Sequence, residues 1–189
     1  MTRNKKVLAV MALAAMAIAG SAGTAVAHAT KSTNPPHRSV QQVRQQRAQI
    51  PEEIRVPQGQ KPIATLPAEG VQTYQCKDND WVFLQPDAIL KINGVPLVLH
   101  SAGPVWTSIR DGSSVTGAVV KSSPVDGAVP QLLLRATANR GESGDGLFSD
   151  VTFVQRLNTQ GGVAPTVSCK DGQTASVPYQ ADYRFWVAK

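Results

Sequence analysis

The chain has 189 residues, with 19 Lys and Arg against 13 Asp and Glu, and a formal net charge of +6. Three of these cations lie in residues 1–27 and four in 28–50, so residues 51–189 carry 12 basic and 13 acidic side chains. A nucleic-acid-binding domain carries its own basic patch, and residues 51–189 have no excess of positive charge to form one. The charge distribution therefore disfavours nucleic acid as a partner.

The first 27 residues have the pattern of a secretory signal peptide. A charged start precedes an apolar run over residues 7–19, and small residues lead to a cleavage site marked by Ala25 and Ala27. The run is short and rich in Ala for a membrane span of about 20 residues, so cleavage is favoured over a retained anchor. We expect an exported protein, periplasmic or extracellular, with no membrane attachment after cleavage.

Residues 28–50 are predicted to be a flexible cationic lead-in. They contain Asn34-Pro35-Pro36 and a polar run, with little apolar surface to bury. The alternative is a cationic tether to anionic envelope polymers or lipid. The remaining residues, 51–189, suit one domain with a core of its own.

Cys76 and Cys169 are the two cysteines, and both lie in the part expected to be exported. In an oxidising compartment the simplest interpretation is a disulfide. It would close a loop of roughly 94 residues, which the chain-entropy model values at about 4 to 5 kcal/mol. A catalytic thiol is the competing interpretation, but it leaves the second cysteine unexplained.

Period-two alternation recurs after residue 50, whereas helical periodicity is nearly absent. In the last segment Tyr183, Phe185 and Val187 alternate with Asp182, Arg184 and Trp186. Earlier, Val151, Phe153 and Leu157 are expected to share one face of a strand. The apolar run 131–136 is typical of a strand covered on both faces.

Turn residues separate these segments. Asn93-Gly94 between two apolar runs predicts a hairpin, and Asp111-Gly112 predicts another turn. Gly-rich loops are expected over residues 139–146 and 159–176, and the prolines at 57, 62 and 67 predict an edge strand or an irregular lead-in. The sequence predicts an all-β fold of about eight or nine strands, an antiparallel β-sandwich or a small barrel, without separating the two.

Ordered sequence blocks run from about residue 50 to the C-terminus. They are the segments 70–76, 86–88, 100–106, 111–113, 130–134, 154–165 and 179–183, with Trp81 and Cys169 between them. Together they resemble the family called the domain of unknown function 3455. Gln131 is a departure, since the family prefers an aromatic residue there. The resemblance implies an exported single-domain protein without established activity, and it transfers no catalytic residue.

His100 is the one histidine of residues 51–189, and Ser101 follows it. The pair could act as general base and hydroxyl in a hydrolase, although no Gly-x-Ser-x-Gly motif occurs. A structural histidine at a strand end is the competing interpretation. Enzymatic activity is left open, with a non-catalytic role favoured.

Metal and cofactor binding have little support in the sequence. One histidine and two bridged cysteines do not supply a familiar zinc set. The oxygen-rich segments 78–80 and 145–150 could hold calcium, but such residues are mostly turn formers. No phosphate-binding glycine motif occurs, so we expect no metal and no cofactor.

The most polar block at the end of an apolar strand spans residues 155–162. Its Gln155, Arg156 and Asn158 could form hydrogen bonds with a ligand, and Trp186 could offer a platform for a sugar ring. The leading hypothesis is a non-catalytic domain that binds an unknown small ligand, a glycan being one candidate. The alternatives are a hydrolase that depends on His100 and acts on an envelope or extracellular substrate, and a structural envelope protein with a protein partner.

Overall fold

A computed structural model describes residues 50–189. The chain divides into two units, residues 1–37 and 38–189, and the described residues belong to the second. The predicted signal peptide, with Ala25 and Ala27, and nearly all of the lead-in lie outside the described residues. Within residues 50–189 no helix has the length and apolar character needed to cross a membrane.

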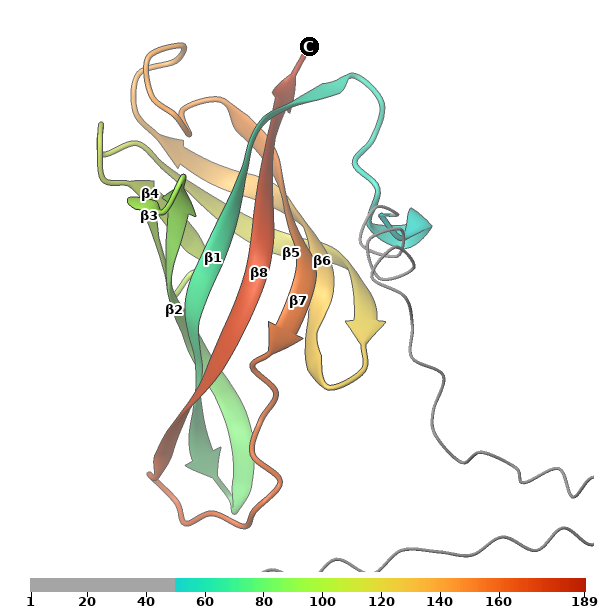
Figure 1. Cartoon of the computed structure of the whole chain (residues 1–189), viewed down its shortest axis with the longest axis vertical. Helices are drawn as coiled ribbons and strands as arrows, with labels where there is room; N and C mark the ends of the chain where they lie inside the picture. Colours follow the sequence, from blue (N-terminus) through green and yellow to red (C-terminus); the bar gives the residue numbers. More distant parts are fainter. Residues whose placement is uncertain (1–49) are drawn as a thin grey trace, which may run out of the picture. The chain divides into compact units, whose positions relative to one another are not determined.

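Eight antiparallel strands close into a barrel, in which each strand pairs with the next and β8 pairs with β1 (Figure 1). A short 3-10 helix, η1, precedes them at Glu52–Ile54. The strands are β1 (Gln60–Lys77), β2 (Asp80–Ile92), β3 (Val95–Ser101), β4 (Val105–Ser108), β5 (Ser114–Val125), β6 (Ala128–Arg140), β7 (Val151–Gly161) and β8 (Thr174–Ala188). The predicted all-β fold is confirmed, and it is a barrel.

The predicted turns join strands where the sequence placed them. Asn93 and Gly94 link β2 to β3 with φ of 50° and 81°, and Gly112 has a φ of 69° between β4 and β5. These positive angles are the ones that Asn and Gly tolerate. Both predicted turns are confirmed.

The first half of β1 has an edge, which explains its prolines. Pairing with β2 begins at Ala68, so residues 60–67 pair with β8 alone. Pro62 lies at a register shift and Pro67 in the singly paired segment. A residue without an N–H is tolerated at such places because no ladder partner is lost.

Aromatic and aliphatic side chains pack together in the barrel interior at the end where β6 connects to β7. The loop between these strands buries Phe148, whose ring lies 4.5 Å from that of Phe185. Leu66, Leu90 and Val115 complete this part of the apolar core. A pocket lies at the other end of the barrel.

A second apolar cluster lies outside the barrel wall. Ile54 of η1 is fully buried against Leu133 and Leu157, and the Gln155 side-chain amide donates to the Ile54 carbonyl at 2.7 Å. Leu134 faces the interior core. Leu133 and Leu134 are therefore covered on opposite faces of β6, as predicted for this run, whereas Arg135 is exposed.

The prediction that Val151 shares one face of β7 with Phe153 and Leu157 is wrong. The register with β8 shifts between Val151 and Phe153. As a result Val151 and Val154 both lie in the interior core, whereas Phe153 and Leu157 pack in the outer cluster. An extra residue at a bulge moves the following side chains to the opposite face.

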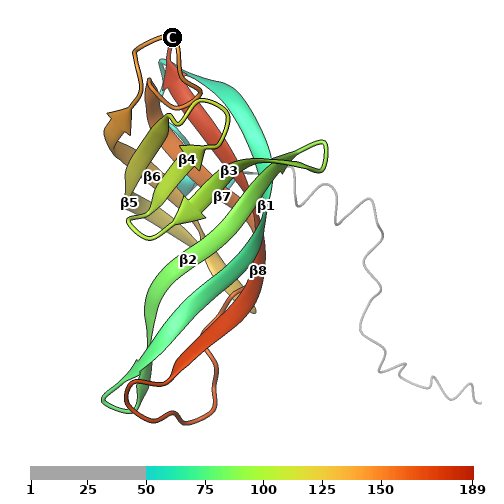
Figure 2. The same cartoon turned by 90° about the vertical axis from the view of Figure 1, so that its left-hand side faces the viewer.

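β1 and β2 extend past the end of the barrel as a long hairpin, which lies beside β8 (Figure 2). A disulfide joins Cys76 near its tip to Cys169, with 5.9 Å between the Cα atoms, so the predicted disulfide is confirmed. The loop that carries Cys169 spans residues 162–173, shorter than predicted, because Gln160 and Gly161 pair with β8. The loop between β6 and β7, which was predicted to begin at residue 139, begins at residue 141 because β6 continues to Arg140.

Candidate functional site

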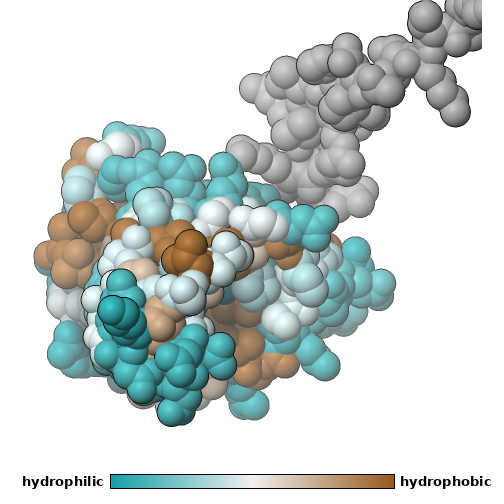
Figure 3. Space-filling view, turned by 90° about the horizontal axis from the view of Figure 1, so that it is seen from below, coloured by the Kyte–Doolittle hydropathy of each residue, from teal (hydrophilic) through white to brown (hydrophobic). Residues whose placement is uncertain are grey.

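A pocket of about 500 Å³ occupies the barrel at the end that carries the β1–β2, β3–β4, β5–β6 and β7–β8 connections. Small-molecule sites have volumes of about 300 to 1,000 Å³, so the pocket is large enough for a ligand. Figure 3 views this end, where hydrophobic side chains appear among hydrophilic ones.

Most of the pocket wall is apolar. Phe83 and Leu84 of β2 are 51% and 48% exposed, so they lie at its mouth. Deeper apolar lining residues from β6 are Val129, Leu132 and Leu134. An aliphatic or aromatic molecule would bury these side chains from water, which is the main source of affinity in such sites.

Six polar or amphipathic side chains interrupt the apolar wall. They are Gln72, Tyr74, His100, Trp106, Arg156 and Tyr183. Among the described residues that line the pocket there is no Asp or Glu. The polar part of the lining therefore carries hydrogen-bond donors and one permanent positive charge.

His100 is fixed by β4. It lies opposite Trp106 in the β3–β4 ladder, and the two rings stack with centroids 4.4 Å apart. The His100 Nδ1 lies 2.9 Å from the Val105 carbonyl oxygen. Because a carbonyl only accepts, Nδ1 carries the hydrogen.

Burial lowers the pKa of His100 to about 4. The hydrogen bond to Val105 acts in the opposite direction, and the nearby Arg156 charge lowers the pKa further. Charging a buried ring is unfavourable because the ion loses its hydration. His100 is therefore neutral at neutral pH.

Ser101 does not share the pocket with His100. Successive side chains of a strand project to opposite faces, and Ser101 is exposed whereas His100 is buried. The structure therefore does not bring together the two residues of the hydrolase hypothesis.

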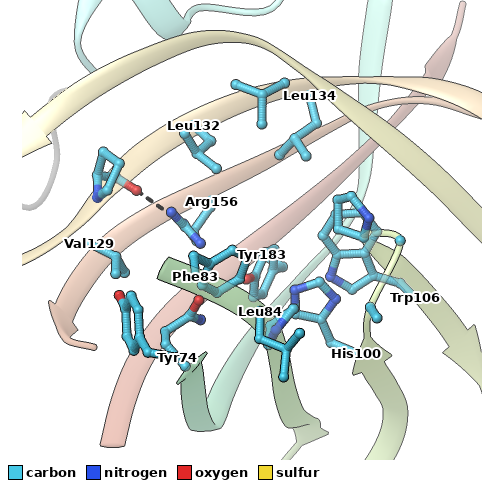
Figure 4. A pocket seen from close by; sticks show the side chains of 17 residues that line it. Tyr74, Phe83, Leu84, His100, Trp106, Val129, Leu132, Leu134, Arg156 and Tyr183 are labelled. Atoms are coloured by element: carbon cyan, nitrogen blue, oxygen red, sulfur yellow. Dashed lines mark hydrogen bonds between the residues drawn. The ribbon is translucent and has the colours of Figure 1, made fainter. Parts of the chain in front are cut away.

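Arg156 projects from β7 into the pocket, where it is only 9% exposed. Its Nε donates to the Pro130 carbonyl at 3.0 Å, the dashed line in Figure 4. The one ion pair among residues 50–189 joins Lys91 and Glu69, so no carboxylate of the described chain lies within 4.0 Å of Arg156. This buried guanidinium lacks a counterion there.

Two further donors of the pocket lining have no partner. The side-chain nitrogen of Gln72 and the indole nitrogen of Trp106 are both buried without a hydrogen bond. Buried polar atoms of native proteins are nearly always paired. Neither nitrogen is accessible to solvent, so a bound molecule could accept a hydrogen bond from either donor once that side chain turned toward the pocket.

The other predicted ligand residues lie elsewhere. Trp186 donates from Nε1 to the Gln155 side-chain oxygen at 2.9 Å, and Gln155 is fully buried. Asn158 donates its side-chain amide to Asp182 at 2.7 Å, and its backbone N–H donates to the Gln131 side chain at 2.9 Å. Of the four predicted ligand residues, Arg156 alone lines the pocket of about 500 Å³.

Sequence reasoning missed most of the pocket. Gln72 and Tyr74 lie two residues apart in β1, and this period-two spacing is the signal that could have placed both side chains on one face of the strand. The partners across the barrel, such as Leu132 and Tyr183, come from strands that are distant in sequence. Their convergence depends on the order and register of the closed barrel.

The oxygen-rich segments form turns. Asp78 and Asn79 have φ of 54° and 65° between β1 and β2. The Asp150 carboxylate accepts from Ser143 Oγ at 2.6 Å and from the Gly144 N–H at 2.8 Å. Within residues 50–189 no group of three or more His, Cys, Asp or Glu is arranged to hold a metal ion.

Comparison of the chain with curated proteins and with solved structures gave no significant match. The profile of one family, described as a protein of unknown function (DUF3455), matches residues 91–187. The matched residues run from the end of β2 almost to the end of β8, so they include His100, Trp106 and Arg156 of the pocket. The match covers just over half of the sequence, and the chain belongs to this family of proteins of unknown function.

Proposed function

We propose that this protein is a non-catalytic binding protein that holds a small, largely apolar molecule in its barrel. The observation that carries the proposal is the pocket of about 500 Å³ with apolar walls at one end of the barrel. Cavities of this size and lining are the usual form of small-molecule sites. The barrel also buries polar groups there that nothing in the described chain pairs.

The lining supports binding better than catalysis. His100 is neutral and its Nδ1 hydrogen is committed to Val105, while Ser101 is exposed on the other face of the strand. Burial raises the pKa of Tyr183, so its hydroxyl is a poor nucleophile at neutral pH. His100, Ser101 and Tyr183 therefore do not form the pair of activated nucleophile and general base that hydrolysis requires.

An apolar ligand suits the pocket better than a glycan. A sugar needs many polar partners for its hydroxyl groups, because a buried group left unpaired costs free energy. The pocket offers few, and Trp186 and Gln155 bond to each other away from it. We therefore place an apolar ligand ahead of a glycan, which was one candidate for the unknown small ligand predicted from the sequence.

The proposed setting is outside the cytoplasm. The disulfide between Cys76 and Cys169 is compatible with an oxidising compartment, and the predicted signal peptide would deliver the chain there. Periplasmic and extracellular destinations both fit this proposal.

The proposal is tested by calorimetric titration of the oxidised full chain with decanol and with decanoate. At least one of these aliphatic probes is expected to bind with one-to-one stoichiometry and a negative heat-capacity change. Ala102 lines the mouth and is exposed, so Ala102→Trp is expected to block the pocket and weaken binding at least tenfold. Ala118 of β5 is exposed and outside the lining, so Ala118→Trp is the matched control.

Two results would reject the proposed function. One is the absence of saturable binding for both probes. The other is binding that Ala102→Trp and Ala118→Trp affect equally, which would place the probe outside the pocket.

A further inference from the structure

We propose that the bound molecule is a monocarboxylic acid with an apolar body, and that its carboxylate pairs with Arg156. This inference rests on the proposed function and specifies its ligand. It is drawn from the charge of the pocket, from its unpaired donors and from the apolar walls around them.

The first argument is the uncompensated charge of Arg156. The guanidinium is charged at every physiological pH, and burying such a charge without a partner is costly. Its hydrogen bond to the Pro130 carbonyl uses Nε, and no carboxylate of residues 50–189 is paired with it. A ligand carboxylate would supply the missing counterion and could be held by two parallel N–H bonds.

The second argument is the pair of unpartnered donors. The Gln72 side-chain nitrogen and the Trp106 indole nitrogen are buried, belong to pocket-lining residues and have no acceptor. A carboxylate only accepts hydrogen bonds, and its two oxygens offer about four lone-pair sites. A ligand cation would provide no acceptor, and an alcohol would provide one oxygen without charge.

The third argument is the electrostatic effect of Arg156 on its neighbours. Its charge acts to lower the pKa of Tyr74 and Tyr183, against the larger effect of burial, which raises both. The same charge disfavours the protonated form of His100. Figure 4 shows Arg156 in the midst of these pocket side chains. A negative head group is therefore attracted and a positive one repelled.

The apolar walls define the rest of the ligand. Leu132 and Leu134 of β6 and Phe83 and Leu84 of β2 line the same cavity as Arg156. No second positive side chain is among the described lining residues. One anionic head with an apolar body therefore fits better than a dicarboxylate or a sugar acid.

The test compares decanoate with decanol, which share a chain and differ in the head group, at pH 7.5 with the full chain. We expect decanoate to bind roughly 10- to 100-fold more tightly, the range for a hydrogen-bonded charge pair. Arg156→Met is expected to remove this preference. Arg135→Met is the matched control, because Arg135 is exposed on β6 and does not line the pocket.

Equal affinity for the two probes in the unmodified protein, with binding still sensitive to Ala102→Trp, would overturn the carboxylate inference and leave the proposed function standing. The absence of binding by either probe would overturn both. Because the unmodified protein decides between these outcomes, the test does not depend on the folding of Arg156→Met. In a folded Arg156→Lys variant, part of the preference for decanoate is expected to remain, since the charge is kept and the planar fork is lost. A preference unchanged in both Arg156 variants would also overturn the inference.

Discussion

Gln155 and Arg156 are neighbours in β7 with opposite roles. Gln155 points outward, where it accepts from Trp186 and donates to the Ile54 carbonyl, so its amide is used within the protein. Arg156 points inward and keeps donors for the pocket. The predicted binding block is divided because strand side chains alternate between faces.

His100 makes stability depend on pH. Its pKa is about 4 in the folded protein, against about 6.5 for an unperturbed histidine. The unfolded chain therefore binds more protons between these values, and stability falls as pH falls through this window. We expect a loss of about 2 kcal/mol between pH 7 and pH 5, measured by urea unfolding.

The control for this prediction is His100→Phe, which keeps an aromatic ring beside Trp106 and cannot be protonated. The variant is expected to lose most of the pH dependence between pH 7 and pH 5, whatever its absolute stability. Glu53 and Asp150, whose pKa values are lowered by hydrogen bonds from Ser123 and from Ser143, lose stabilisation only at lower pH. If the free energy of unfolding of His100→Phe fell with pH as steeply as that of the unmodified protein, other groups would be the cause of the pH dependence.

At the scale of elements, the disulfide and several hydrogen bonds hold the 162–173 loop against the β1–β2 hairpin. Trp81 donates to the Val167 carbonyl at 2.9 Å, and Tyr74 donates to the Gly162 carbonyl at 2.6 Å. Tyr74 also lines the pocket. The loop is therefore connected to one wall of the pocket.

We expect the double variant Cys76→Ala, Cys169→Ala to be less stable by up to about 4 to 5 kcal/mol, because the unfolded chain is no longer cross-linked. The measurement is chemical unfolding of the oxidised protein and of the variant. As a control, reducing agent should destabilise the unmodified protein and leave the variant unaffected. Equal stability of variant and oxidised protein would contradict this account of the disulfide.

The sequence predicted the secondary structure well where a turn residue or a local pattern of apolar residues determines the conformation of the backbone. The Asn93-Gly94 turn, the alternation of β8 and the burial of Leu133 and Leu134 on opposite faces of β6 are examples. The face of β7 was not predictable, because the bulge after Val151 depends on its pairing with β8. Gln72, His100 and Arg156 come from strands far apart in sequence, and the barrel register alone brings them to one pocket.

At the scale of the whole described domain, residues 50–189 form one closed barrel with packed aromatic rings at one end and a pocket at the other. Phe148 and Phe185 fill the interior near the β6–β7 loop, whereas the opposite end holds an open pocket of about 500 Å³. Because each strand pairs with a neighbour on either side over part of its length, the strands around the pocket form a closed sheet. Such a sheet can hold an internal cavity without collapse of the fold.

The most direct test is to titrate the full chain with decanoate and to record, by NMR, which backbone and side-chain groups change their chemical shift. We expect saturating shifts at the indole N–H of Trp106, at Gln72 and at Arg156, with little change at Trp186 outside the barrel wall. Shifts confined to outward-facing residues would contradict the claim that the barrel interior is a ligand site, and so would the absence of shifts with decanoate and with decanol alike.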